Sequence, residues 1–168
     1  MIVIADTSPI NYLILIGEID LLRALYGRVL IPPSVRHELG STGAPEPVRV
    51  WMVHPPAWLE TKAPRGNADP LLSFLDAGER DAILLAEELH ADQIVIDEML
   101  GRREARRRKL PCTGTLGILR AAANEGLVDL ALAVARLRKT NFHISEDVLN
   151  HLLGTPKPVR MPKTDGDT

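Results

Sequence analysis

The sequence predicts an α/β protein in which helices cover both faces of a central, mostly parallel sheet. Short apolar runs rich in β-branched residues occur at 2–5, 29–31 and 94–96, and each is followed by a stretch with helical spacing of apolar residues. Strands that alternate with helices are typical of parallel sheets. Two of the runs end in an acid, Asp6 and Asp97. Because ligands bind beyond the carboxyl ends of such strands, these acids mark the edge where a functional site is expected.

The first half of the chain holds short elements separated by glycine and proline. Leucine and isoleucine recur at helical spacing in 10–16 and 19–26, and Thr7 or Ser8 can cap the first of these helices. Two prolines follow the strand at 29–31, and no central strand would continue through them. The elements expected after these prolines are helices over 34–39 and 48–53 and a strand over 58–61.

The second half has clearer helical patterns. Glu79 opens an amphipathic stretch that ends near His90, just before the strand at 94–96. Three more helical patterns follow the basic segment at 102–109 and lie over 115–125, 129–139 and 145–153. We therefore expect one domain over 1–153, followed by a Pro-, Lys- and Asp-rich tail over 154–168 that is predicted to be disordered.

Composition excludes several classes of protein. The chain has 168 residues, of which 45% are apolar and 25% charged, with a formal net charge of −2, and such a chain is neither disordered nor fibrous. No apolar run is long enough to cross a membrane, so no membrane association is expected. The N-terminus does not resemble a secretory signal. Cys112, the one cysteine in the sequence, cannot form an internal disulfide, which fits the cytoplasm.

Four acids stand out by position: Asp6, Glu38, Glu79 and Asp97. Taken singly, each has a structural interpretation, as a helix cap, a favourable charge at a helix N-terminus or a solvated side chain. Taken together at one sheet edge, like charges about 5 Å apart would repel by roughly 3 kcal/mol at an effective dielectric near 20. Such a cluster needs raised pKa values or a cation.

The cation that suits this set is Mg²⁺ or Mn²⁺, because all the predicted ligands are carboxylate oxygens. The five histidines are scattered and Cys112 is alone, so no zinc-type ligand set is present. A carboxylate-bound dication can activate water and neutralise charge that builds up on a phosphodiester. The predicted chemistry is therefore metal-dependent hydrolysis, with Asp6 or Asp97 as the general base.

Several segments resemble motifs of the PIN-domain ribonucleases, in the branch related to toxins of toxin–antitoxin pairs. The opening Asp6-Thr7-Ser8, with Asn11 beyond it, resembles the first motif of that family, and 35–39 around Glu38 resembles the second. The later motifs, in chain order, are similar to Ala77–Ala86 with Glu79, Ile94–Glu98 with Asp97, and Gly114–Leu119 with Thr115. The likeness covers about residues 1–153.

Membership would imply a three-layer α/β/α sandwich, a divalent metal at the acidic cluster and cleavage of single-stranded RNA. It would also imply a homodimer and an inhibitory antitoxin partner. The third acid is Glu79, where many of these toxins have Asp. The fourth motif offers both Asp97 and Glu98, and strand alternation points them to opposite faces, so Asp97 is the preferred ligand.

A basic segment from Arg102 to Lys109 holds six cations in eight residues. It is either a solvated helical face or a phosphate-binding rim. In the second interpretation Arg102 contacts the scissile phosphate, and the later arginines, which are Arg103, Arg106, Arg107 and Arg108, grip flanking phosphates. The polar residues Thr7, Asn11 and Thr115 can contact the substrate or the acids, or serve only as caps and turns.

Two other functions are compatible with the sequence. A phosphohydrolase could use Asp6 as a covalent nucleophile, although such enzymes commonly have a second Asp two residues later, where this chain has Ser8. Alternatively, the chain is an RNA-binding or partner-binding module whose catalytic site has decayed. Such a module would keep the basic helix and bind no cation.

Overall fold

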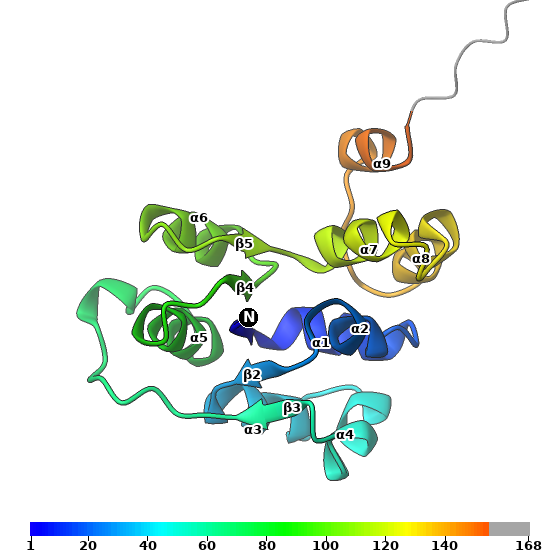
Figure 1. Ribbon diagram of the computed structural model, residues 1–168. Helices are drawn as coiled ribbons and strands as arrows, with labels where there is room; N and C mark the ends of the chain where they lie inside the picture. The colour runs from blue at the N-terminus through cyan, green and yellow to red at the C-terminus, as the bar shows by residue number, and fades with distance from the viewer. Residues whose placement is uncertain (155–168) are drawn as a thin grey trace, which may run out of the picture.

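The computed structural model describes residues 1–154, so the expected tail at 154–168 lies outside the described residues except for its first position. Within this range the strands form one sheet, ordered β3-β2-β1-β4-β5, and every neighbouring pair is parallel (Figure 1). The strands are β1 (Val3–Ala5), β2 (Val29–Ile31), β3 (Leu59–Thr61), β4 (Gln93–Val95) and β5 (Cys112–Thr113). The predicted parallel α/β architecture is therefore confirmed.

The helices agree with the predicted patterns to within a few residues. They are α1 (Thr7–Leu15), α2 (Asp20–Tyr26), α3 (Pro33–Gly40), α4 (Glu46–Val53), α5 (Ala77–Glu88), α6 (Met99–Arg107), α7 (Thr115–Asn124), α8 (Leu130–Arg138) and α9 (Glu146–Leu153), with a short 3₁₀ turn η1 (Pro70–Leu72) before α5. None of the helices over residues 1–154 has the length and hydrophobicity needed to cross a membrane.

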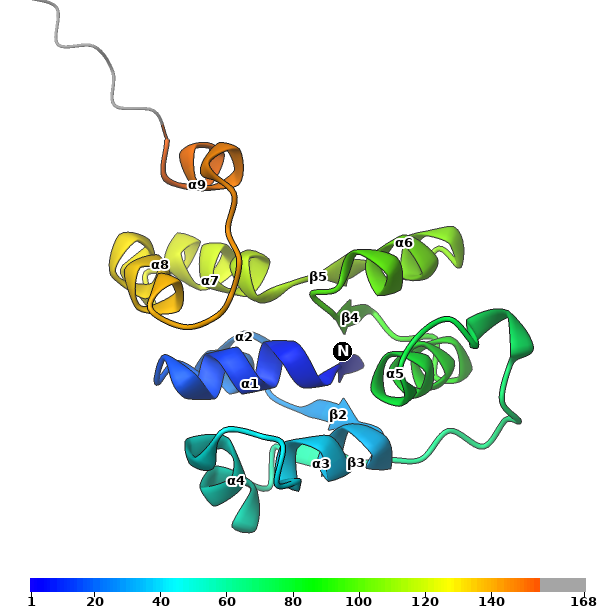
Figure 2. The same cartoon turned by 180° about the vertical axis from the view of Figure 1, so that it is seen from behind.

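Helices cover both faces of the sheet and form the three layers. Figures 1 and 2 show α5 and α6 on one side of the strands, and α1, α2, α7 and α8 on the other. Side chains alternate along each strand, so neighbours in β1 belong to different cores: Ile4 packs under α5 and α6, whereas Val3 and Ala5 pack under α1, α2 and α7. The helix α9 stands at the edge of the second side and packs through Leu149.

Two details differ from the sequence prediction. The first helix begins at Thr7, one or two residues earlier than a cap at Thr7 or Ser8 implies, because Asp6 occupies the extended N-cap position. The strand β5 was not predicted. It has only two residues, Cys112 and Thr113, and follows a proline, so its sequence carries no alternation that a strand pattern could detect. It forms because Ile94 and Val95 of β4 offer an unpaired edge.

The strand β1 lies at the centre of the sheet, between β2 and β4. In the register of β1 with β4, Ala5 is the partner of Val95, and the backbone N–H of Asp6 donates to the Val95 carbonyl at 2.9 Å. The chain leaves both strands at the same edge. Residues that follow the two strands therefore meet where helices α1 and α6 begin.

Candidate functional site

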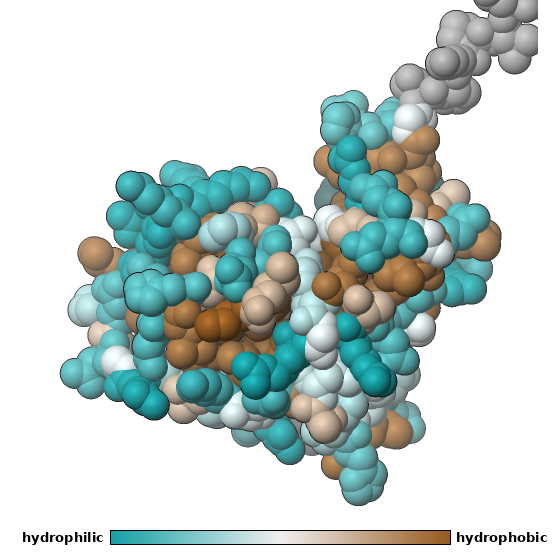
Figure 3. Space-filling model, viewed as in Figure 1, coloured by the Kyte–Doolittle hydropathy of each residue, from teal (hydrophilic) through white to brown (hydrophobic). Residues whose placement is uncertain are grey.

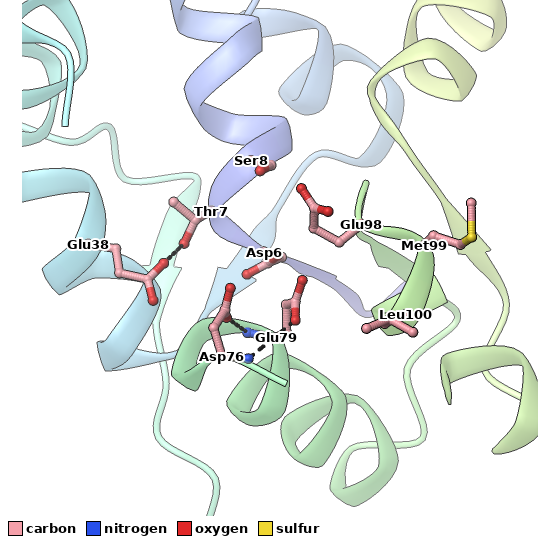
Figure 4. A pocket seen from close by; sticks show the side chains of 9 residues that line it. All are labelled: Asp6, Thr7, Ser8, Glu38, Asp76, Glu79, Glu98, Met99 and Leu100. Atoms are coloured by element: carbon pink, nitrogen blue, oxygen red, sulfur yellow. Dashed lines mark hydrogen bonds between the residues drawn. The ribbon is translucent and has the colours of Figure 1, made fainter. Parts of the chain in front are cut away.

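A pocket of about 380 Å³ opens at the carboxyl edge of β1 and β4. Figure 4 shows carboxylates that enter it from three directions, around the first turn of α1. The residues that line it are Asp6, Thr7, Ser8, Glu38, Asp76, Glu79, Glu98, Met99 and Leu100. Three of the four predicted acids are thus brought together, and they are joined by Asp76 and Glu98.

Asp6 lies at the floor of this pocket. Asp6 is only 3% exposed, and its side chain does not cap the second or third residue of α1. Its Oδ1 atom is buried without any hydrogen-bond partner. Burial raises the pKa of Asp6 well above its usual value, and the charges of Asp76, Glu79 and Glu38 raise it further, although a backbone hydrogen bond from Thr7 opposes them. A buried carboxylate oxygen without a partner is costly, so this atom is suited to receive a ligand.

Glu79 and Asp76 form a capping box at the start of α5. The Asp76 carboxylate accepts from the Glu79 backbone N–H at 2.8 Å, and the Glu79 carboxylate accepts from the Asp76 N–H at 3.4 Å. Glu79 is 5% exposed. Its burial raises its pKa to about 7, and the neighbouring charges of Asp76, Glu98 and Glu38 act in the same direction. The Glu79 side chain therefore both caps α5 and lines the pocket.

Glu38 enters the pocket from α3, and the hydroxyl of Thr7 donates a short hydrogen bond to its Oε2. A glycine allows the close approach of α5 to this pair. A Cβ at position 78 would lie 3.0 Å from Asp6 Oδ1 and 3.0 Å from Glu38 Oε2, tighter than most real contacts of a Cβ atom. Gly78 thus leaves the space between the two carboxylates open to an ion or a water molecule.

Asp97 does not line this pocket. It follows Val95 and Ile96, and alternation along the strand turns its side chain towards α7. There its carboxylate accepts from the Thr115 N–H at 2.7 Å and from the Thr115 hydroxyl at 2.8 Å. Burial raises the pKa of Asp97, although the two hydrogen bonds from Thr115 lower it in part.

Glu98 occupies the place expected for Asp97, since it lines the pocket together with Asp6 and Glu79, and Figure 4 shows its carboxylate near Ser8. The two side chains diverge, as strand alternation predicts, but Glu98 and not Asp97 lines the pocket. The reason is register: Asp6 follows Ala5 directly, whereas Asp97 follows the matching residue Val95 by two positions.

The sequence matches the description PIN domain over residues 2–157. The chain belongs to the PIN-domain family. Its fold is similar to that of a PilT N-terminus domain protein from the hyperthermophilic archaeon Sulfolobus solfataricus, with a TM-score of 0.50 and 12% sequence identity, covering 86% of this chain and 100% of that one. No curated protein sequence matches the chain. The family match confirms the resemblance seen in the motifs. PIN domains are typically nucleases and generally depend on a divalent metal, and the fold of this chain is therefore nuclease-like.

The donor set of this PIN domain fits a hard dication in its chemistry. Every charged group that lines the pocket is a carboxylate, and Asp6 offers a buried, unpartnered oxygen. The carboxylates stand apart, however. Over residues 1–154, no three His, Cys, Asp or Glu side chains are grouped closely enough to form a metal-binding cluster. Ion binding therefore requires side-chain rotations, for which the pocket has room.

The basic helix α6 of the PIN domain has two kinds of arginine. Arg102 lies near Asp97 in a neighbouring pocket, where a Cβ on Gly114 would be 2.7 Å from Asp97 Oδ1 and 2.9 Å from Arg102 Nη1. Arg103 and Arg106 are exposed on the outer side. Arg107 and Arg108 instead form ion pairs within the protein.

Arg108 is the most heavily engaged of these side chains. Its guanidinium donates to Glu104 at 2.7 Å, to Glu87 at 2.7 Å and to Asp69 at 2.8 Å, and it is 10% exposed. This arrangement leaves Arg108 unsuited to the phosphate contact that it would make if the basic segment were a phosphate-binding rim. Arg107 donates to Glu104 through Nε at 3.0 Å and Nη2 at 2.6 Å, and remains 59% exposed.

The other predicted polar residues have clear positions. Asn11 lines an adjoining pocket that shares Thr7 and Ser8 with the carboxylate pocket. Thr115 is fully buried and bonded to Asp97. Asp76 was not among the predicted acids, and Asp97 was preferred to Glu98. The spacing Asp76-x-x-Glu79 is a capping-box pattern and could have pointed to Asp76.

Proposed function

We propose that this PIN domain is a Mg²⁺- or Mn²⁺-dependent endoribonuclease that hydrolyses phosphodiester bonds of single-stranded RNA. The observation that carries the proposal is the buried, unpartnered Oδ1 of Asp6, which lies across from Glu38 at the space left by Gly78, in a pocket that Glu79 also lines. A site that gathers five carboxylates and holds no cationic side chain is unfavourable by itself. A dication makes it favourable.

The residues that would hold the ion are Asp6, Glu38, Glu79 and Glu98, with Asp76 positioned behind Glu79 by the capping box. When bound, Mg²⁺ or Mn²⁺ supplies activation of water and neutralisation of charge on the phosphodiester. Without the ion the pKa of Glu79 is about 7, so a dication competes with a proton for this carboxylate. The proposed contacts to RNA phosphates come from four arginines of α6, which are Arg102, Arg103, Arg106 and Arg107. The proposed polar contacts to the RNA or to the acids come from Thr7, Asn11 and Thr115.

The proposal extends to the biological setting that the resemblance implied. In that setting the protein is the toxin of a toxin–antitoxin pair, assembles as a homodimer and is inhibited by an antitoxin protein. Growth arrest after expression of the wild type, relieved by Asp6→Asn, would support the toxin role. Normal growth with a fully active nuclease would contradict it.

The deciding experiment compares cleavage of single-stranded RNA by the wild type and by Asp6→Asn, each with Mg²⁺, with Mn²⁺ and with EDTA. We expect cleavage only by the wild type and only with a dication. Asp20→Asn is the matched control, because Asp20 lies at the start of α2 and outside the carboxylate pocket. Equal cleavage by Asp6→Asn and the wild type would show that the carboxylate pocket is not the catalytic site.

A second candidate is the decayed binding module, and the separation of the carboxylates favours it. Calorimetric titration with Mn²⁺ separates the two functions. If the protein is a nuclease, we expect the wild type to bind Mn²⁺ with a defined stoichiometry and Asp6→Asn to bind none. A decayed module would bind RNA and show no Mn²⁺ binding above background.

A further inference from the structure

A groove of about 340 Å³ lies beside the carboxylate pocket, between the segment that leads into α5 and the outer side of α6. Its walls are Phe74, Leu100, Arg103, Glu104 and Arg107. Leu100 also lines the carboxylate pocket, so the two cavities share a wall. A chain that leaves the carboxylate pocket over Leu100 therefore enters this groove.

The apolar walls of the groove are unusually open to solvent. Phe74 is 54% exposed and Leu100 is 51% exposed. Exposed apolar side chains are common on proteins, so their exposure alone carries no inference. Here, however, one of the two phenylalanines of the chain stands two residues before Asp76 and lines the groove together with Arg103 and Arg107.

The charge of the groove is positive on balance. Its one carboxylate, Glu104, accepts hydrogen bonds from Arg107 and Arg108, which hold the pKa of Glu104 at about 2. Arg103 has no ion-pair partner within residues 1–154. It stands one helical turn before Arg107, so both side chains share one face of α6. Figure 3 shows that hydrophilic side chains cover α6.

We propose that this groove binds one nucleotide of single-stranded RNA, next to the nucleotide at the scissile bond, with the base stacked on Phe74 and the phosphate held by Arg103 and Arg107. The inference rests on the proposed ribonuclease function. An aromatic ring flanked by cations is the combination by which proteins bind single strands without sequence preference. The volume also lies in the range of small-ligand sites.

The rival occupant of such a groove is a protein, for example a second copy of this chain. Apolar and arginine side chains are common at protein interfaces too. The balance of charge favours the nucleic acid, because the only acid in the groove is already neutralised by two arginines. A polyanion gains from the uncompensated Arg103, whereas an apolar protein surface would have to desolvate it.

The test measures binding of a fluorescein-labelled single-stranded RNA of mixed sequence by anisotropy, in EDTA so that the RNA stays intact. Phe74→Ala should weaken binding about fivefold to tenfold, and Phe74→Trp should restore it. Leu71→Ala is the matched control, since Leu71 is 67% exposed and lies outside the groove. Because Phe74 is half exposed, its truncation should leave the melting temperature nearly unchanged.

The salt dependence separates stacking from phosphate binding. Phe74→Ala should leave the slope of log K against log salt unchanged, whereas Arg103→Gln should reduce its magnitude by about 0.7, the value for one phosphate contact on a single strand. Arg23→Gln on α2 controls for the loss of one surface charge. In Phe74→Trp, the additional tryptophan fluorescence should be quenched by RNA, which binding by charge alone would not produce.

The inference is overturned if Phe74→Ala binds RNA as the wild type does, if Leu71→Ala weakens binding equally, or if the wild type binds no RNA. A different result would assign the groove to a second copy of the chain. In that case Phe74→Ala would bind RNA as the wild type does, and sedimentation would show a wild-type dimer and a Phe74→Ala monomer. If Asp6→Asn abolishes cleavage but Phe74→Ala cleaves limiting RNA as the wild type does, the proposed subsite is wrong and the proposed nuclease function stands. If RNA binding depends on Phe74 but the wild type cleaves no RNA, the proposed nuclease function is wrong and the proposed subsite stands.

Discussion

Thr115 donates two hydrogen bonds to Asp97, one from its backbone N–H at 2.7 Å and one from its hydroxyl at 2.8 Å. The pair ties the end of β4 to the first turn of α7, and Thr115 is completely buried. Asp97 therefore caps a helix from outside that helix, which is a structural task. This relationship separates Asp97 from the carboxylates that face Asp6.

Removal of the Thr115 hydroxyl should cost stability and spare the carboxylate pocket. Thr115→Val keeps the shape of the side chain and deletes one hydrogen bond to a charged group, so we expect a loss of about 2 kcal/mol in the free energy of unfolding. Urea unfolding measures it. Calorimetry should show unchanged Mn²⁺ affinity, and a large loss of that affinity would mean that Asp97 belongs to the ion site after all. Thr61→Val on the edge strand β3 is an exposed control.

The stability of the ion-free protein should fall as pH rises. The pKa of Glu79 is about 7 in the folded chain, against its usual 4.5, so between these values the folded state binds more protons than the unfolded state. The free energy of unfolding therefore decreases with pH across this interval, by up to about 3 kcal/mol from this group. The raised pKa of Asp6 acts in the same direction.

Glu79→Gln isolates this contribution, because glutamine can keep the capping-box bond to Asp76. Urea unfolding in EDTA at pH 5 and pH 8 should show a smaller decrease for Glu79→Gln than for the wild type. Added Mn²⁺ should stabilise the wild type more at pH 8 than at pH 5, since it competes with protons for the same oxygens. Identical pH profiles of the two proteins would contradict the raised pKa of Glu79.

Gly78→Ala tests the narrow space between Asp6 and Glu38. The added methyl group would lie 3.0 Å from an oxygen of each, so the carboxylates must move apart. We expect Mn²⁺ affinity to fall about tenfold, measured by calorimetry, while the melting temperature changes little because alanine favours the helix. The control is Gly40→Ala at the end of α3, where a Cβ meets nothing within 4 Å. Equal Mn²⁺ binding by both variants would argue against an ion at this position.

Arg108→Leu should destabilise the fold severely. The substitution leaves Glu104 without one of its two cations and removes the ion-pair partner of Glu87 and Asp69, so we expect a loss of about 3 to 5 kcal/mol. Thermal and urea unfolding measure it. Arg107→Gln should cost far less, because that side chain is mostly exposed and its ion pair is screened by water. A stable Arg108→Leu protein with weakened RNA binding would restore the phosphate-binding role expected from the sequence.

Much of the fold follows from local pattern. The runs at 29–31 and 94–96 are short and β-branched, and the helical spacing around Ala82 and Ile83 is regular, so the alternation of strands and helices could be predicted. The two-residue strand β5 could not, because its pairing is a property of the exposed edge of β4 and not of Cys112 and Thr113 themselves.

The site was predictable in part. Asp6, Glu38 and Glu79 converge because their elements end or begin at one edge of the sheet. The choice between Asp97 and Glu98 depended on the register of β4 against β1, a contact between residues about 90 positions apart that no local pattern encodes. The role of Arg108 was hidden for the same reason. Its partners Asp69 and Glu87 come from segments distant in the sequence.

The pairing of β1 with β4 also has a consequence for protein synthesis. Val3 and its partner Gln93 are 90 residues apart, so the central strand of the sheet remains incomplete while the ribosome adds all the intervening residues. The carboxylates of Asp6 and Glu98 first meet when more than half of the polypeptide has emerged. A nascent chain arrested before that point would lack Glu98 and the pairing of β1 with β4, and it could not complete the pocket.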